Sequence, residues 1–248
     1  MAEPSAPSDP GAAIAGRLRV VRETIARACE RSGRRPEDVR VVAITKTVAT
    51  DVILEARAVG LEDFGENYAR DLAAKAPAIP ARWHFVGALQ RGTAHLVATH
   101  AHIVHSAVPG RGLERLARHA HGLGRTIDCL VQVDFSGRRN GVAPDRAMQA
   151  ADRVAELEGV RLAGLMTLPP LGDQPEDARP WFVRLRALRD SIVPVHPEAV
   201  AMSMGMSADY QVAVEEGATM VRIGTALFGS RPAGSVGEPS PGHREGTS

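Results

Sequence analysis

The chain has 248 residues, a formal net charge of +1 and few aromatic residues, namely five Phe, two Trp and two Tyr. Acidic and basic residues are interspersed, so no basic surface points to nucleic acid or to an anionic membrane. No run approaches the roughly 18 apolar residues needed to cross a bilayer, and the amino terminus lacks the basic start and apolar stretch of a signal peptide. We therefore expect a cytoplasmic protein that binds neither nucleic acid nor a membrane.

The two ends of the chain differ in composition from the part between them. Residues 1–12 and 232–248 are rich in Pro, Gly, Ser and Glu and have almost no large apolar side chains, which predicts two disordered tails. The remaining residues, 13–231, suit one large domain. Its two cysteines, Cys29 and Cys129, have no metal or redox spacing, and we expect them to be core residues in a reducing compartment.

The apolar residues predict helices and strands in alternation. A leading amphipathic helix is expected over 14–31, and short apolar runs predict strands at 39–45, 61–64, 83–86, 102–105, 127–134, 160–166, 199–203 and 219–223. Helical patterns lie between them at 50–59, 66–76, 110–121, 145–158, 176–190 and 207–217. This alternation predicts an α/β protein, a single (β/α)8 TIM barrel with a leading N-terminal helix. An open doubly wound sheet is the alternative, but its first strand is usually followed by a glycine-rich turn that is missing here.

Lysine is scarce in this chain. Lys and Arg together number 30, and only Lys46 and Lys75 are lysines. Lys46 closes the apolar run 39–46, and arginine cannot replace lysine where an amine must lose its proton and attack a carbonyl. We take Lys46 as a candidate nucleophile, and a lysine that reaches water from a strand end is an equally good interpretation. Lys75 is predicted to lie in the solvated last turn of a helix.

Polar and glycine-rich residues follow the predicted strands at one rim of the barrel. In this fold the functional groups gather at the carboxyl ends of the strands, and phosphate binds near the loops after strands seven and eight. Gly205 and Gly224 permit close backbone approach there, and Ser203 and Thr225 supply hydroxyl groups. Each segment alone is typical of an ordinary turn, but together they predict a phosphate site.

A lysine that faces a phosphate site suits a phosphorylated aldehyde or ketone. Two ligands fit this description, pyridoxal 5′-phosphate (PLP) and the sugar phosphate of a lysine-dependent aldolase. Arg222 on the last strand favours PLP, because PLP sites place an Asp or Arg partner at the pyridine nitrogen. A phosphate counter-charge or a structural ion pair is an equal alternative for Arg222.

Several motifs occur in the order found in one protein family. These motifs are Ile44-Thr45-Lys46-Thr47, Phe64-Gly65-Glu66-Asn67-Tyr68, Trp83-His84-Phe85-Val86-Gly87, Leu89-Gln90, His105-Ser106, Met202-Ser203-Met204-Gly205-Met206-Ser207-Ala208-Asp209 and Thr219-Met220-Val221-Arg222-Ile223-Gly224-Thr225-Ala226-Leu227-Phe228-Gly229. Through them the chain resembles the pyridoxal phosphate homeostasis proteins (YggS-like family) over about residues 14–231.

The resemblance implies a barrel like the N-terminal domain of alanine racemase, with PLP bound to Lys46 as an internal aldimine. It implies that Arg222 faces the pyridine nitrogen and that the phosphate is held by Ser203, Gly205, Gly224 and Thr225. His84 on the third strand either hydrogen-bonds inside the barrel or approaches the cofactor. The complete expected set of cofactor-binding residues is Lys46, Asn67, His84, Ser106, Met166, Ser203, Gly205, Met206, Arg222, Gly224 and Thr225.

The role that the resemblance implies is control of free PLP (vitamin B6) and of amino-acid and keto-acid balance. We expect a monomer without a dedicated catalytic activity, with PLP-dependent enzymes as its clients. The chain differs from the family's common pattern at accessory lysines, with Val48 two residues after Lys46 and with Arg138 and Arg139 before Gly141.

Two enzymes and a metal centre are the alternatives. One alternative is a PLP-dependent amino-acid racemase of low activity, which needs a second acid/base, typically a tyrosine from another domain. We expect no room for that domain in this chain, whose two tyrosines are Tyr68 and Tyr210. A lysine-dependent aldolase needs an acidic residue beside its lysine, a role open to Glu66. His100 and His102 have the spacing of two metal ligands on a strand, but the signal is weak and lies at the amino end, so no metal is expected.

Overall fold

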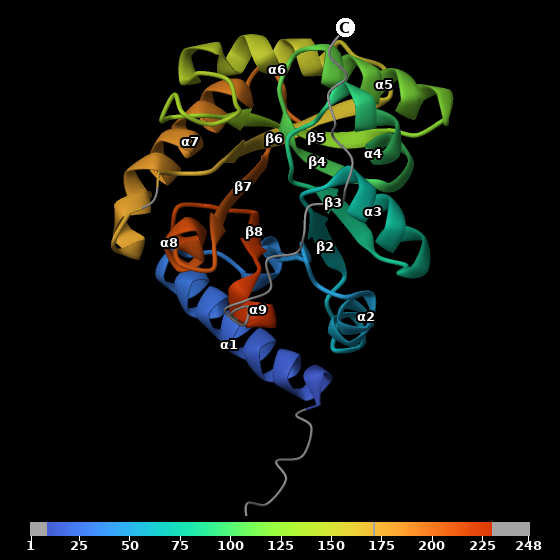
Figure 1. Cartoon of the computed structure of the whole chain (residues 1–248). Helices are drawn as coiled ribbons and strands as arrows, with labels where there is room; N and C mark the ends of the chain where they lie inside the picture. Colours follow the sequence, from blue (N-terminus) through green and yellow to red (C-terminus); the bar gives the residue numbers. More distant parts are fainter. Residues whose placement is uncertain (1–8, 171, 230–248) are drawn as a thin grey trace, which may run out of the picture.

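The computed structural model describes residues 9–170 and 172–229, in which eight parallel strands close into one barrel in chain order (Figure 1). The strands are β1 (Arg40–Ile44), β2 (Asp63–Glu66), β3 (Arg82–Phe85), β4 (Ile103–Ala107), β5 (Ile127–Val133), β6 (Val160–Thr167), β7 (Ala201–Met206) and β8 (Met220–Ile223). The helices of the same part are α1 (Pro10–Arg31), α2 (Thr50–Ala58), α3 (Ala69–Lys75), α4 (Ala94–His100), α5 (Arg111–Gly122), α6 (Ala147–Ala155), α7 (Arg179–Ile192), α8 (Tyr210–Glu215) and α9 (Thr225–Phe228). The predicted single (β/α)8 barrel with a leading helix is confirmed.

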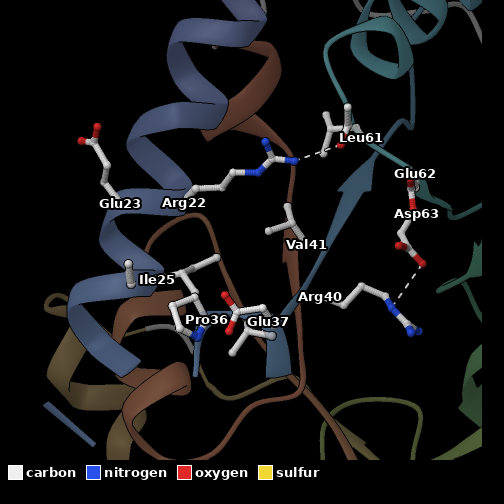
Figure 2. A pocket seen from close by; sticks show the side chains of 13 residues that line it. Arg22, Glu23, Ile25, Pro36, Glu37, Arg40, Val41, Leu61, Glu62 and Asp63 are labelled. Carbon is white, nitrogen blue, oxygen red and sulfur yellow. Dashed lines mark hydrogen bonds and ion pairs between the residues drawn. The ribbon is translucent and has the colours of Figure 1, made fainter. Parts of the chain in front are cut away.

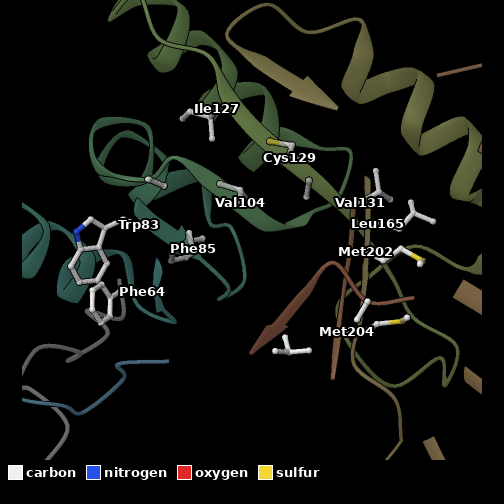
Figure 3. Close-up of a cluster of buried hydrophobic side chains, with 14 of the residues drawn as sticks. Phe64, Trp83, Phe85, Val104, Ile127, Cys129, Val131, Leu165, Met202 and Met204 are labelled. Carbon is white, nitrogen blue, oxygen red and sulfur yellow. The ribbon is translucent and has the colours of Figure 1, made fainter. Parts of the chain in front are cut away.

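The barrel wall separates two apolar layers. Successive residues of a strand point to opposite faces, and parallel sheets are covered on both faces. Phe64, Phe85 and Val104 belong to the large core cluster that also contains helix residues (Figure 3). A second, smaller cluster consists of Val42, Ile103, Leu130, Met166 and Met220. The position of a residue in its strand therefore decides whether its side chain lies under the helices or inside the barrel.

Helix α1 leads the chain and packs against α8, α2 and α9 (Figure 1). It begins at Pro10, a residue that suits the first turn of a helix, and the Asp9 carboxylate accepts a hydrogen bond of 2.9 Å from Gly11 N. Its apolar stripe is buried at Ile14, Leu18, Val21, Ile25 and Cys29. Residues 10–12, which composition assigned to a tail, are thus helical. The tail predictions for residues 1–8 and 232–248 lie outside the described residues.

Several element predictions needed correction, among them β7, which begins two residues later than predicted, and α3 and α8, which each begin three residues later. Strand β2 begins at Asp63, two residues later than predicted, because Leu61 is buried ahead of the strand. Helix α4 was not predicted, since its buried face consists of the small residues Ala94, Val97 and Ala98, which produce little amphipathic pattern. Both cysteines are buried, as predicted. Within the described ranges, no helix has the length and apolar character that a membrane span requires.

Candidate functional site

Lys46 lies on a strained turn just after β1. The turn over residues 45–48 is closed by a hydrogen bond of 2.9 Å from Val48 N to Thr45 O. Thr47, its third residue, has a φ of 64° and is the one non-glycine residue with positive φ in the described part of the chain. A β-branched residue in the left-handed region is strained, and such strain is characteristic of functional sites. Lys46 itself is exposed.

A cavity of about 280 Å³ joins Lys46 to the segment after β8. Lys46, Thr47 and Val48 line one side, and Gly224 and Thr225 line the other. The two segments meet because the barrel closes between its first and last strands, which pair along their length. The structure therefore brings together the predicted nucleophile and one half of the predicted phosphate site.

Gly224 leaves space beside Lys46. A Cβ atom added at Gly224 would meet only Ile44, at the ordinary distance of 3.7 Å from its Cβ, and the φ of Gly224 is −114°. The protein backbone thus does not itself require glycine here, and the missing side chain leaves room for a ligand. This observation fits a phosphate group at the position that the sequence predicted.

Ser207 is a rim residue that was not among the expected cofactor-binding residues. Its Oγ accepts hydrogen bonds of 3.3 Å from both Gly224 N and Ala226 N, so it joins the loop after β7 to the loop after β8. The signal for it was present, because Ser203-Met204-Gly205-Met206-Ser207 contains two hydroxyl groups four residues apart. The second of them lies at the rim.

Gly205 and Met206 hold the end of β7 against α8. Gly205 has a φ of 89°, and a Cβ atom there would lie 2.5 Å from the Cβ of Ala213. Glycine is therefore needed at 205 for close packing and for the backbone conformation. Met206 is half-buried, and its N–H donates to Asp209 Oδ1 at 2.6 Å. Burial raises the pKa of Asp209 above its ordinary value.

Arg222 is buried inside the barrel rather than exposed at the rim. Its Nη1 donates to Ser203 Oγ at 2.5 Å and its Nη2 to the carbonyl oxygen of Thr167 at 2.9 Å. Ser203 is fully buried, and its Oγ also pairs with His105 Nδ1 at 2.8 Å. Ser203 thus supports the guanidinium from inside the barrel, and its contact with the phosphate stays a prediction. Burial lowers the pKa of Arg222 to about 10, against the opposing charge of Asp209.

The hydrogen-bonded chain continues from His105 across the barrel. His105 Nε2 lies 2.7 Å from His84 Nδ1, and His84 Nε2 lies 2.8 Å from Asp63 Oδ1. Of the two interpretations of His84, hydrogen bonding inside the barrel is observed, and its contact with a cofactor stays a prediction. Burial lowers the pKa of both histidines, well below the ordinary value for His105, where the charges of His84 and Arg222 act in the same direction.

Asp63 is the last member of this series of hydrogen-bonded side chains and lies at the amino side of the barrel. Burial acts to raise the pKa of Asp63, but the hydrogen bond from His84 and the charges of Arg40 and Arg82 outweigh it and hold that pKa below its ordinary value. Arg82 Nη1 lies 3.2 Å and Arg40 Nε 3.5 Å from Asp63 Oδ1. The buried carboxylate therefore has cations toward solvent and neutral imidazoles toward the barrel interior.

The remaining predicted residues lie at the ends of β2, β4 and β6. Asn67 is half-buried after β2, and Gly87 packs so closely on it that an added Cβ would overlap the Asn67 carbonyl. Ser106 is buried, and its Oγ donates to the carbonyl oxygen of Gly87 at 2.5 Å. Met166 belongs to the apolar cluster inside the barrel. These residues shape and tie the rim, and their contact with a cofactor stays a prediction.

Lys75 is not solvated, contrary to the sequence prediction. Its side chain is 13% exposed, and its Nζ lies 2.6 Å from Oε1 of Glu66, which is fully buried. Both donors to Glu66, Lys75 Nζ and Thr45 Oγ1, bind Oε1, and no group in the described part of the chain donates to Oε2. Glu66 is thus held behind the turn by an ion pair, which does not fit the proton-transfer role that an aldolase would give it.

A larger cavity of about 660 Å³ lies at the opposite, amino side of the barrel, between α1, β1 and the start of β2 (Figure 2). Both arginines that line it bind the protein: Arg22 Nη2 donates to the carbonyl oxygen of Gly60 at 2.9 Å, and Arg40 pairs with Asp63. This side of a barrel serves stability rather than chemistry. His102 lies at the same side and accepts a hydrogen bond from Trp83 N at 3.0 Å, while His100 ends α4, so the two do not share a strand face.

The fold and the site agree with comparisons to known proteins. The family model described as alanine racemase, N-terminal domain, matches residues 17–232, and the chain belongs to this class of α/β barrels. An alanine racemase of Clostridium difficile 630 shares the fold with a TM-score of 0.69 at 15% identity, covering 88% of this chain and 58% of that one.

Closer relatives define the family within this class. The pyridoxal phosphate homeostasis protein of Aquifex aeolicus (strain VF5) is 38% identical over 221 residues, which are 87% of this chain and 97% of that protein. PipY of Synechococcus elongatus PCC7942, solved with PLP bound, is 32% identical with a TM-score of 0.77, covering 87% of this chain and 100% of that chain. The chain belongs to the pyridoxal phosphate homeostasis protein family, as its motifs predicted.

Proposed function

We propose that this protein binds PLP through Lys46 and acts in PLP (vitamin B6) homeostasis and in amino-acid and keto-acid balance. The observation that carries the proposal is the cavity shared by Lys46, Gly224 and Thr225. Two relatives support it, since the Aquifex aeolicus protein carries the name pyridoxal phosphate homeostasis protein and PipY was solved with PLP bound. When bound, PLP supplies an aldehyde that condenses with an amine and a ring that withdraws electrons.

Each part of the ligand has a matching group in the protein. Lys46 Nζ would bond to the aldehyde carbon, and the aldehyde oxygen would leave as water. The phosphate would bind at Gly224, Thr225 and Ser207, beside two hydroxyl groups and next to the N–H groups of Gly224 and Ala226, which donate to Ser207 Oγ in this structure. Arg222 would face the pyridine nitrogen. With a pKa of about 10 it keeps its charge at neutral pH, and a cation there disfavours a protonated ring.

The cavity favours a carrier over a racemase. Among the described residues that line it, none besides Lys46 is an acid or base: no His, Asp, Glu or Tyr is included. Tyr68 is 61% exposed after β2, and Tyr210 begins α8 and packs against the core. A racemase needs a second proton donor opposite its lysine, and neither tyrosine lines this cavity.

The proposal includes a monomeric, cytoplasmic protein that hands PLP to PLP-dependent client enzymes. Lys46 is exposed, so a bound cofactor would be accessible to a second protein. Cys29 and Cys129 are buried and unpaired, as suits a reducing compartment.

The test is the visible absorption spectrum of the purified protein after addition of PLP. We expect a yellow band in the wild type that is absent in Lys46→Ala, and borohydride reduction that places the adduct on Lys46 in peptide mapping. A wild-type protein without a band, or label on Lys75 or the amino terminus, would overturn the proposal.

A further inference from the structure

The two lysines of the chain come from different elements and meet at one backbone position. Lys75, the last residue of α3, donates from Nζ to the carbonyl oxygen of Thr45 at 2.9 Å. The same Nζ pairs with Glu66 Oε1 at 2.6 Å, and Thr45 Oγ1 donates to that oxygen at 2.7 Å. Since Thr45 directly precedes Lys46, the second lysine binds the backbone that carries the first.

The carbonyl of Thr45 is also the acceptor that closes the turn. Val48 N donates to it at 2.9 Å, so two donors, one from the turn and one from α3, fix one oxygen. The turn places Thr47 at a φ of 64°, a conformation that a β-branched residue holds only when its surroundings enforce it. Lys75 is the side chain outside the turn that binds this oxygen.

The geometry also accounts for lysine at position 75 in a chain where Lys46 is the one other lysine among 30 Lys and Arg residues. One nitrogen atom must reach both a carboxylate oxygen and a carbonyl oxygen in a space where the Lys75 side chain is 13% exposed and Glu66 is fully buried. An ammonium is compact enough for this, whereas a guanidinium is a wide planar fork. Glu66 in turn holds the ammonium in place.

We propose that Lys75 and Glu66 are positioning residues for Lys46, and that their ion pair holds the strained turn in the conformation that presents the Lys46 amine to the cavity. The proposal rests on the proposed role of Lys46, but it concerns two residues outside the cavity lining. Neither residue would contact the ligand.

The main test compares the wild type with the double variant Glu66→Gln plus Lys75→Met, which removes the ion pair without leaving a buried charge unpaired. One readout is the equilibrium constant for the Lys46 adduct with PLP, taken from the visible absorption before reduction, with the site confirmed by borohydride trapping and mass spectrometry. The other is the acylation rate of Lys46 by acetic anhydride in cofactor-free protein, mapped by mass spectrometry. We expect adduct formation to fall by about tenfold, the factor that corresponds to releasing one strained residue, and the acylation rate of Lys46 to change. Binding of pyridoxamine 5′-phosphate, which has no aldehyde, should stay unchanged.

Three further variants sharpen the test. Lys75→Arg keeps the charge but not the geometry, and we expect it to resemble the double variant. Thr47→Gly removes the strain, so the double variant should lose much less adduct in that background. Arg70→Met removes an exposed cation from the same helix and should behave as wild type.

The outcomes separate the two proposals. If the wild type binds neither PLP nor pyridoxamine 5′-phosphate, the proposed function fails. If the wild type forms the adduct and the double variant forms it equally well, with unchanged Lys46 acylation, the positioning role fails. Equal losses with and without Thr47→Gly would also contradict it, because the ion pair would then act on something other than the strained turn.

Discussion

Arg222 is a buried cation whose near partners are neutral. It donates to the Ser203 hydroxyl and the Thr167 carbonyl, and behind Ser203 lie the imidazoles of His105 and His84. A buried charge is costly unless its hydrogen bonds are satisfied, and neutral imidazoles avoid adding repulsion to that cost. The lowered pKa values of both histidines are consistent with this arrangement, since a proton on His105 would place a second cation next to Arg222.

Stability is therefore expected to fall as the solution becomes acidic. Because the pKa of His105 in the folded protein lies below its ordinary value of 6.5, the unfolded chain binds the proton first as the pH falls. The contribution of neutral His105 to the free energy of unfolding is fully present above about pH 6.5. Below that pH it is lost, by about 1.4 kcal/mol for each pH unit. Denaturant unfolding between pH 7.5 and 5 should show a shallower dependence in His105→Asn than in the wild type.

His95, exposed on α4, provides the matched control. The variant His95→Asn should keep the wild-type pH dependence. A dependence in His105→Asn as steep as in the wild type would show that His105 is not protonated on unfolding. The comparison uses slopes, because loss of the hydrogen bonds to Ser203 and His84 lowers the stability of His105→Asn at every pH.

For single residues, the sequence was a better guide to the residue types of the site than to their positions in the fold. Lys46 and Gly224 were expected at one rim and share a cavity there. Ser203 and Ser207 are equivalent as sequence signals, but only the packed barrel shows that Ser203 bonds Arg222 inside it while Ser207 bonds backbone N–H groups after β8. The buried site of Lys75 depends on its contact with Glu66, which helical periodicity does not report.

The elements at the rim are held by close backbone approaches. Strand β7 meets α8 at Gly205, where the positive φ lets the chain turn and the missing side chain lets Ala213 pack against the backbone. Asp209 ties the same corner through its bond from Met206 N. The loop that carries Ser207 is thus fixed by α8, and with it one side of the proposed phosphate site.

Gly205→Ala should therefore destabilise the protein. The added Cβ meets Ala213 at 2.5 Å and is placed at a φ of 89°, so left-handed strain and overpacking add to about 2–5 kcal/mol. Gly16→Ala is the control, since a Cβ at this position in α1 has nothing within 4 Å. It should stabilise by about 0.5–1 kcal/mol, because alanine favours a helix. Equal effects of the two changes in thermal unfolding would contradict the packing argument.

Strands were easier to predict than short helices. Strands such as β1 and β5 are covered on both faces, so their sequences contain apolar, β-branched runs that stand out between polar loops. Helix α4 buries only Ala94, Val97 and Ala98 and has no side-chain cap, and its position follows from the barrel's need to cover β3 and β4. The hydrogen-bonded chain from Asp63 to Arg222 was also outside prediction, because it joins residues of five strands and Thr167 of β6.

At the scale of the molecule, the cavity lies where the barrel closes. Lys46 follows β1 and Gly224 follows β8, and these strands pair between Arg40 and Met220 and onward to Ala43 and Ile223. Helix α1 covers the same region by packing on α2, α8 and α9 (Figure 1). A ligand that bonds to Lys46 and binds at Gly224 therefore links the first and last strands, and its binding energy adds to the stability of the whole barrel.

PLP should consequently raise the melting temperature in a concentration-dependent way. At about 100 times the dissociation constant, binding to the folded state alone adds about 2.7 kcal/mol, which for a domain of this size corresponds to a rise of about 5–10 °C. Lys46→Ala should lose most of this rise, because only the phosphate and ring contacts remain. Pyridoxal, which lacks the phosphate, should give a much smaller rise in the wild type. If pyridoxal stabilised the wild type as strongly as PLP, the loops at Gly224 and Ser207 would not bind phosphate, whereas a full rise in Lys46→Ala would mean that the first strand takes no part in binding.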